Sequence, residues 1–451
     1  MERAASVARG LQAAGIASRI VLDRKAGEQM GKALSASIRG RRAVVLCSPL
    51  GEKAGAGAYG AYNARVAGAQ PVVLPLLSEA PTVECVKAAV AASARVGAEM
   101  VVGVGGRGVV EVARAVSMLL ANAGSAEDFA CDLGATPPPI APLPCALVPT
   151  LPTARECARS ATLMAAGRTS LTLLPFDPPA GEPGADECVL LDPSVLSGSH
   201  RNDLAPALMG VVITAIEQAC QVGAPEHARY AAWRAALAGA WALRLLGLPR
   251  SGPPPSSELV ATLAAEASVV ASAAVAAAST LSSAPGPAAM LGNAAAVRYE
   301  VSQLALSAAC GASALEALED REEGDGSAAA EEAMHWHEHM AGAMARLREA
   351  PPTTEALDAI LEAEPRPSGR TESPDAAEGE ELLASWEGLL AGQPGGWAPG
   401  ALLDALVPED LSSADMWHIA AGAMSEPGAA GALAGLSTQD LVRFLDESLD
   451  R

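Results

Sequence analysis

Two glycines, Gly105 and Gly106, follow the short apolar run Met100–Val104 and precede a stretch of helical composition. A strand that leads through a tight glycine turn into a helix can hold the pyrophosphate of a dinucleotide, because backbone N–H groups and the helix dipole point at the phosphates. Glycine suits such a turn since a side chain would stand between backbone and phosphate. Arg107 and Gly108 come next. The Arg107 guanidinium binds phosphate by charge, fills the cleft, or caps a solvent-facing turn.

Three histidines, His335, His337 and His339, form the only histidine cluster, in MHWHEHM. On a helix His335 and His339 share one face, and Glu331 or Glu332 could join them. Such a face has adventitious affinity for zinc or nickel, and a plain polar surface helix is the other interpretation.

The elements that would position these residues change character along the chain. Short β-branched runs alternate with Ala-rich helical runs up to about residue 195, which predicts a parallel sheet covered on both faces. Beyond residue 196 only helical runs follow. The predicted strands are Ala43–Cys47, Pro71–Leu74, Met100–Val104, Cys145–Val148 and Cys188–Leu191; the main predicted helices are Ala58–Ala69, Thr82–Val96, Leu204–Cys220, His227–Leu246, Ser257–Leu281, Ala294–Leu318 and Ala328–Arg348.

This pattern predicts an α/β dinucleotide-binding-like domain followed by an all-helical domain. We expect an N-terminal extension at 1–18, the α/β domain at 19–195 and the helical domain at 196–363. An acidic linker of Pro, Gly, Ser and acids spans 364–380, one more helix spans 381–393, and a helical C-terminal extension spans 394–451.

The composition excludes several classes of partner. A formal net charge of −21 and an aromatic content of 3% argue against nucleic acid, which needs clustered basic residues and stacking rings, and against an anionic membrane surface. The sequence has no stretch of about 20 strongly apolar residues, so it predicts no membrane span. Ala267–Leu281 is interpreted as a packed interior helix. Eight cysteines without a C-x-x-C pair indicate thiols in a reducing compartment, either the cytoplasm or an organellar matrix. The basic segment Met1–Arg19 is either a mitochondrial-type targeting helix or an added helix.

The segment Asp192–Glu217, DPSVLSGSHRNDLAPALMGVVITAIE, resembles the metal-binding segment of iron-containing alcohol dehydrogenases and maleylacetate reductases. These enzymes have a dehydroquinate synthase-like fold. Their segment runs from an Asp-Pro to [DN]-A-[IL]-x-H-A-[IV]-E. Gly210 stands where that family has Asp or Asn, and Thr214 stands where it has the metal-binding His. Glu217 still matches.

Further pieces are similar to the same family in the same order, over roughly residues 19–393. Gly105–Arg114 resembles G-G-G-S-x-x-D-x-A-K, with Glu111 and Arg114 keeping the signs of charge. Pro149–Glu156 resembles P-T-T-x-x-G-S-E: Thr150 and Glu156 match, whereas Ala154–Arg155 replaces the Gly-Ser that lies against the nicotinamide in the family, so Pro152 and Arg155 are expected to add bulk there. Other matching pieces are Arg19–Leu22, Val44–Pro49 and Glu364–Pro367. The resemblance thus implies a vestigial cofactor site at Gly105, Gly106, Arg107, Gly108, Thr150 and Glu156.

The resemblance also places the two remaining histidine ligands of the family. Anchored on Cys310, the motif H-x-x-x-H-x(9)-H puts Ala296 at the first ligand and Cys310 at the last, with Glu300 between them. The implied set of Gly210, Thr214, Ala296 and Cys310 offers at most one strong donor. A divalent metal needs three or four donors converging on one point, so we expect no inherited metal.

The sequence therefore predicts a catalytically inactive relative of this family that acts as a structural or accessory subunit of a larger assembly. Its expected partners are other protein subunits, with a homodimer implied by the family's pairing through N-terminal strands, and no cofactor is expected. The alternative is a metal-independent NAD(P)H-dependent reductase resembling maleylacetate reductase, with an anionic or carbonyl substrate near Arg107, Arg155 and Arg298 and with Arg or Thr214 polarising the carbonyl. A third hypothesis is a sensor that binds nucleotide without turnover.

Overall fold

The computed structural model of the chain forms two compact units. The first comprises Met1–Ser199 with Ala296–Ser302, and the second His200–Ala295 with Gln303–Arg451. The residues that the structure describes are 19–34, 38–165, 171–177, 186–198, 201–221, 224–247, 257–278, 328–351 and 353–362, with isolated positions at 288, 291–292, 294, 416–417, 419–420, 439 and 441–443. The predicted extension at 1–18, the linker and the helix at 381–393 lie outside them, as does nearly all of the C-terminal extension.

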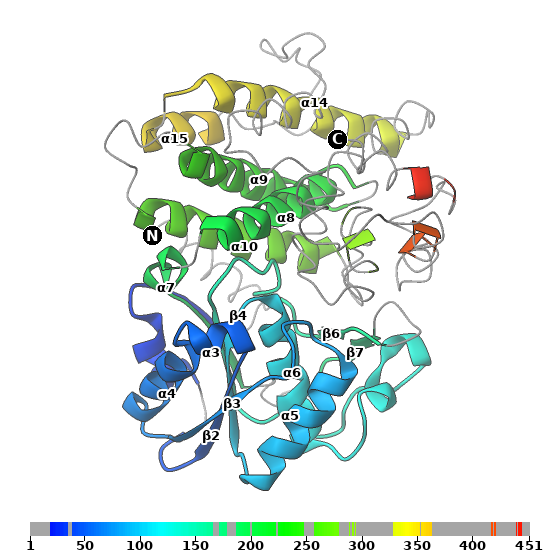
Figure 1. The fold of residues 1–451 in the computed structure, drawn as a ribbon. Helices are drawn as coiled ribbons and strands as arrows, with labels where there is room; N and C mark the ends of the chain where they lie inside the picture. The colour runs from blue at the N-terminus through cyan, green and yellow to red at the C-terminus, as the bar shows by residue number, and fades with distance from the viewer. Residues whose placement is uncertain are drawn as a thin grey trace. The chain divides into compact units, whose positions relative to one another are not determined.

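The N-terminal unit is built on a six-stranded parallel sheet in the order β1-β8-β5-β4-β2-β3 (Figure 1). The strands are β1 (Arg19–Leu22), β2 (Arg42–Cys47), β3 (Gln70–Pro75), β4 (Met100–Gly105), β5 (Cys145–Pro149) and β8 (Glu187–Leu191). Val45 of β2 lies opposite Val102 of β4, which sets the register at the centre of the sheet. The predicted α/β fold class is confirmed. A separate antiparallel pair, β6 (Ala161–Leu163) and β7 (Leu171–Leu173), was not predicted.

Helices cover the sheet because its central strands are apolar throughout. Every residue of β4 and β5 is buried. The main covering helices are α4 (Ala56–Val66), α5 (Val83–Arg95) and α6 (Arg107–Ala121). Thr82 caps α5 by accepting a hydrogen bond from the Cys85 N–H. The shorter helices of this unit are η1 (Ala26–Gln29), α2 (Met30–Ala33), α3 (Pro49–Lys53), η2 (Glu127–Phe129), η3 (Cys131–Leu133) and α7 (Pro193–Ser197).

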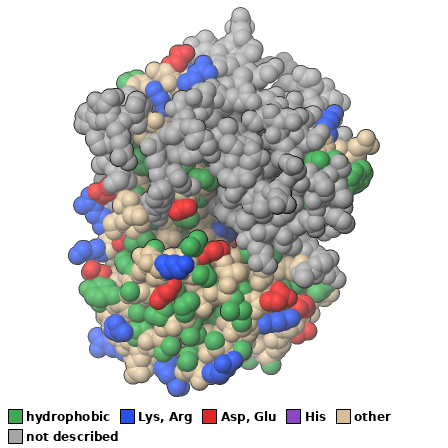
Figure 2. Space-filling model, viewed as in Figure 1, with side chains coloured by type: hydrophobic (Ala, Val, Ile, Leu, Met, Phe, Trp, Pro, Cys, Tyr) green, Lys and Arg blue, Asp and Glu red, His purple; other side chains and the backbone are tan. Residues whose placement is uncertain are grey.

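One glycine allows α4 to approach the sheet closely. A Cβ at Gly60 would lie 2.7 Å from methyl groups of both Val45 and Val104. Any larger residue would therefore push the helix away from β2 and β4. On the surface of this unit, Figure 2 shows hydrophobic, basic and acidic side chains interspersed.

Helices are the only regular secondary structure among the described residues of the second unit. Its long helices are α8 (Arg201–Ala219), α9 (Glu226–Gly247), α10 (Ser257–Ala278) and α14 (Ala328–Glu349), with the shorter α15 (Thr354–Glu362). Helix α9 packs against both α8 and α10. The fully buried Arg229 donates hydrogen bonds to the carbonyl oxygens of Ala219 and Ala224, so its charge lies at the C-terminus of α8, where the helix dipole favours a cation.

One helix among the described residues is long and apolar enough to cross a membrane. It is the stretch Glu258–Ala276 of α10, and most of it is buried inside the unit. That burial is typical of a core helix, the interpretation given to this region from its sequence. The seven cysteines in the described part of the chain are free thiols, and six of them are buried.

Candidate functional site: a glycine turn beside a buried charge network

The glycine turn predicted from the sequence lies at the carboxyl end of β4. Gly105 ends the strand, Gly106 is the N-cap residue in an extended conformation, and α6 begins at Arg107. In the sheet, β3 lies on one side of β2 and β4 lies on the other, so the direction in which successive strands are added reverses between β3 and β4. Ligands of open parallel sheets bind outside the carboxyl ends of the strands at such a switch point. The turn is therefore placed where a bound nucleotide is expected.

The space at Gly106 suits a phosphate group. The nearest atom to a Cβ built on Gly106 is Leu151 Cδ1, at 3.8 Å. The first N–H groups of a helix have no partner within the helix and carry the positive end of its dipole. The adjoining turn is fixed because the Thr150 N–H donates to the Gly105 carbonyl oxygen at 2.9 Å. These residues fit the pyrophosphate of a dinucleotide, which they would hold through backbone amides.

Gly108 serves packing between segments of the same unit. A Cβ there would overlap the backbone carbonyl oxygen of Glu79. The Glu79 carboxylate in turn accepts a hydrogen bond from the Leu50 N–H, in the first turn of α3, at 2.9 Å. The segment at Glu79 thus joins the first turns of α6 and α3, and only glycine at position 108 leaves room for its backbone.

The Arg107 side chain is half-buried at the start of α6. The side chain is only partly exposed, its Nε is shielded from solvent, and its positive charge acts on the Glu111 carboxylate one turn further along α6.

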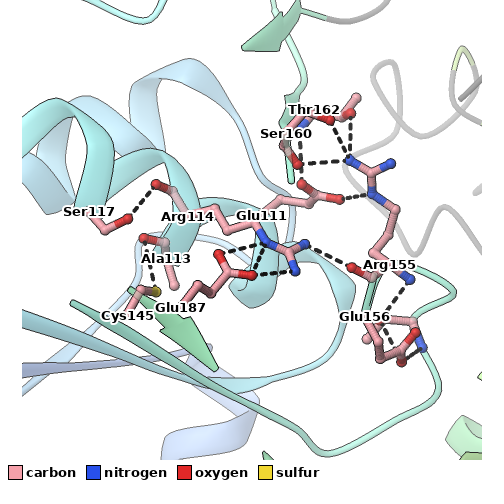
Figure 3. A network of polar contacts seen from close by, with 11 residues as sticks. Glu111, Ala113, Arg114, Ser117, Cys145, Arg155, Glu156, Ser160, Thr162 and Glu187 are labelled. Atoms are coloured by element: carbon pink, nitrogen blue, oxygen red, sulfur yellow. Dashed lines mark hydrogen bonds and ion pairs between the residues drawn. The ribbon is translucent and has the colours of Figure 1, made fainter. Parts of the chain in front are cut away.

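The central polar feature of the N-terminal unit is a buried ion pair between Arg155 and Glu111 (Figure 3). Arg155 Nε donates to Glu111 Oε1 at 2.6 Å, and Arg155 Nη2 donates to the Ser160 carbonyl oxygen at 3.0 Å. The Thr162 N–H donates to the other Glu111 oxygen at 2.9 Å. The Arg155 residue is 6% exposed and Glu111 is 1% exposed. The pair connects α6 to the loop that follows β5 and to β6.

A second buried pair supports the first. Arg114 Nε and Nη2 donate to the Glu187 carboxylate at 3.0–3.2 Å, and Arg114 Nη1 donates to the Arg155 carbonyl oxygen at 2.9 Å. Arg114 therefore holds the backbone of Arg155 while Glu111 holds its side chain. Burial raises the pKa of Glu111, but the charge of Arg155, followed by those of Arg114 and Arg107, outweighs burial and leaves that pKa below its usual value.

This network corrects the expectation for the motif Pro149–Glu156. Arg155 was expected to add bulk beside a cofactor, and in the reductase alternative to face a substrate. Its guanidinium instead lies inside the unit, on Glu111, Ser160 and Thr162. Glu156 is buried too and accepts hydrogen bonds from the N–H and hydroxyl of Thr153 at 3.2 and 2.8 Å. This motif is held together by its own side chains.

Ala154, next to Arg155, has a left-handed backbone with φ of +52°. A non-glycine residue with this backbone conformation costs roughly 1–2 kcal/mol. Glycine removes that cost, but it loses more chain entropy on folding, which offsets about 0.5–1 kcal/mol of the gain. We expect Ala154→Gly to raise the free energy of unfolding of the N-terminal unit by up to about 1 kcal/mol. Urea denaturation followed by far-UV circular dichroism measures it. Ala146→Gly, in the buried strand β5, is the control and is expected to destabilise; equal effects of the two changes would contradict the argument.

Two of the four degenerate metal positions are described, and both lie on α8. Thr214 Oγ1 donates to the Gly210 carbonyl oxygen at 2.8 Å, so the hydroxyl is used inside the helix. Glu217, further along α8, accepts a hydrogen bond from the Ala288 N–H at 2.6 Å. Ala296 and Cys310 lie outside the described residues. Within the described ranges no three His, Cys, Asp or Glu side chains come together as a metal site.

The histidine cluster on α14 is divided between two faces. His335 and His339 lie side by side, with 3.1 Å between their Nε2 atoms. His337 is buried. The side chains of Glu331 and Glu332 lie outside the described part of the helix.

Comparison with known proteins identifies the fold. Residues 17–175 match the family model of iron-containing alcohol dehydrogenases, and among curated proteins none matches this chain by sequence. Among solved structures, the iron-containing alcohol dehydrogenase of Thermococcus thioreducens aligns with a TM-score of 0.67 at 14% identity, over 96% of this chain and 99% of that one. The NADH-dependent butanol dehydrogenase A of Thermotoga maritima aligns with a TM-score of 0.65 at 17% identity, over 95% and 96%. The chain therefore has the fold of the iron-containing alcohol dehydrogenases, and its residues 17–175 also match that family by sequence.

Proposed function

We propose that this chain is a catalytically inactive relative of the iron-containing alcohol dehydrogenases that serves as a structural or accessory subunit of a larger assembly. The observation that carries the proposal is the hydrogen bond from Thr214 Oγ1 to the Gly210 carbonyl oxygen. These are two of the four positions at which the resemblance places metal ligands. Gly210 has no side chain to bind a metal, and the Thr214 hydroxyl is engaged within α8.

The chemistry of a metal-dependent dehydrogenase needs more than these residues offer. A divalent ion that polarises an alcohol or a carbonyl is held by several nitrogen or oxygen donors and keeps one position open. Gly210, Thr214, Ala296 and Cys310 together provide at most one strong donor, the Cys310 thiolate. The chain's own residues at these positions therefore offer too few donors to hold the ion that would activate the substrate.

The reductase alternative is disfavoured by the engagement of two of its proposed electrophiles, Arg155 and Thr214. Without a metal, hydride transfer to a carbonyl needs a donor that stabilises the developing oxyanion. Arg155 is paired with Glu111 inside the N-terminal unit, and the Thr214 hydroxyl hydrogen is already donated. The pyrophosphate fit at Gly106 remains, so binding of a nucleotide alone is compatible with the proposal, whereas turnover is not.

The accessory role is supported by the surface over the outer edge of the sheet. Tyr62 and Val66 of α4 are 57% and 52% exposed, and Val72 of the edge strand β3 is 37% exposed. Helix α4 packs on β3 through Val73. Val72 therefore lies on the other face of the edge strand, and apolar side chains are exposed on both sides of this edge. Exposed apolar groups beside an edge strand favour association with another protein chain.

The native mass of the protein tests the accessory role. We expect tagged protein in gently prepared extract of its source cells to elute well above two copies of the 45.3 kDa chain, and recombinant protein alone to elute at lower mass. Size-exclusion chromatography with light scattering makes both measurements. Identical masses for the cellular and the recombinant protein, at one or two copies, would contradict an assembly with other subunits.

A further inference from the structure

The face of α14 that carries His335 and His339 has the geometry of a two-histidine metal site. The two residues are one helical turn apart, and their Nε2 atoms are separated by 3.1 Å. The ring centroids lie 4.3 Å apart, with the ring planes at 86°. His335 is exposed and His339 is partly exposed, so the pair can be reached from solvent.

The separation of the two nitrogens matches what a shared metal ion requires. Imidazole nitrogen binds zinc at about 2.0–2.1 Å, so two such bonds at square-planar or tetrahedral angles place the nitrogens roughly 2.9–3.4 Å apart. Without a metal, one Nε2–H donates to the other Nε2, and the ion takes the place of that proton, which moves to Nδ1 of the same ring.

We propose that His335 and His339 bind one divalent ion of the late first transition series, with Cu²⁺ held more tightly than Ni²⁺ or Zn²⁺. Imidazole ligands and the general order of stability for divalent metals favour this choice. Among the described residues no third His, Cys, Asp or Glu joins the pair, so water completes the coordination and the ion exchanges readily. The site lies on α14 and uses none of the four positions on which the family's metal depends.

Titration of the untagged protein with CuCl₂, NiCl₂ and ZnCl₂ in a non-chelating buffer at neutral pH tests this site. Isothermal calorimetry is expected to give one equivalent of Cu²⁺, and His335→Asn or His339→Asn is expected to weaken its binding at least about tenfold, since each removes a ligand. His227→Asn is the matched control, because His227 is a single exposed histidine on another helix, α9. Its binding is expected to equal that of the unchanged protein.

Electron paramagnetic resonance of the Cu²⁺ complex gives a second readout. The unchanged protein is expected to show coupling to two imidazole nitrogens, and each α14 variant to at most one. Unchanged affinity and spectrum in both α14 variants, or an equal loss in His227→Asn, would overturn the proposal. Far-UV circular dichroism of every variant verifies that the helices are intact.

Discussion

Replacing Arg155 with Met is expected to lower the free energy of unfolding of the N-terminal unit by about 3–5 kcal/mol. The change leaves the Glu111 carboxylate buried without its closest cation, which lies at 2.6 Å, while Met keeps much of the side-chain volume. The loss of stability arises because the Glu111 charge stays buried without its partner. Accordingly Glu111→Gln in the same chain is expected to recover a large part of the loss, because the double variant buries no unpaired charge.

The measurement must report on the N-terminal unit. All six tryptophans follow residue 199, so tryptophan fluorescence follows only the helical unit. Urea denaturation by circular dichroism, combined with hydrogen–deuterium exchange of the α6 and β6 peptides, isolates the relevant transition. Arg159→Met is the matched control: Arg159 is exposed and donates to the Phe176 carbonyl oxygen, and its loss is expected to cost less than about 1 kcal/mol. Equal effects of the two changes would show that the buried pair does not hold this loop.

Changing Gly108 to Ser restores the residue that the related motif has at this position, yet we expect it to destabilise the unit by about 1–3 kcal/mol. A Cβ at position 108 overlaps the backbone oxygen of Glu79. Because the obstacle is backbone, the segment at Glu79 has to move away from α6, and the hydrogen bond from Leu50 to the Glu79 carboxylate is strained or lost. The same denaturation and exchange measurements detect this, with loss of protection expected first around Glu79.

Gly106→Ser is the comparison for this prediction, since it makes the same chemical change two residues away. The Cβ at 106 has its nearest neighbour at 3.8 Å and the backbone φ is −74°. It is therefore expected to fold with less than about 0.5 kcal/mol of change. A Gly108→Ser variant as stable as Gly106→Ser would contradict the close approach of the Glu79 segment.

The sheet could be predicted from the sequence because its strands are continuous apolar runs. Val44–Leu46 and Val101–Val104 are short and rich in β-branched residues, and turns of Gly or Pro separate them from the helices. The three-residue strands β6 and β7 could not be predicted, because strands this short have no periodicity and are defined only by pairing with each other.

The glycine turn was predicted at its observed place, whereas the role of Arg155 was not. From sequence alone an arginine beside a nucleotide motif indicates phosphate or substrate contact. Its partner Glu111 is 44 residues away, so only the fold brings the two together. A signal was present nevertheless: Glu111 and Arg114 kept their charges while Arg155 introduced a new one nearby in the resembling motifs. A new charge in one motif, beside a retained opposite charge in the other, favours an internal ion pair.

The absence of turnover is the central claim, and one assay tests it most directly. The His335→Asn/His339→Asn variant, which lacks the proposed α14 site, is loaded anaerobically with Fe²⁺ or Zn²⁺ and its bound metal is determined. It is then assayed at 340 nm for NAD(P)⁺-dependent oxidation of primary alcohols and NAD(P)H-dependent reduction of aldehydes and of maleylacetate. The account predicts substoichiometric metal and no turnover above a protein-free control. Turnover that persists through purification and disappears in Gly106→Arg, which fills the nucleotide turn, would contradict it.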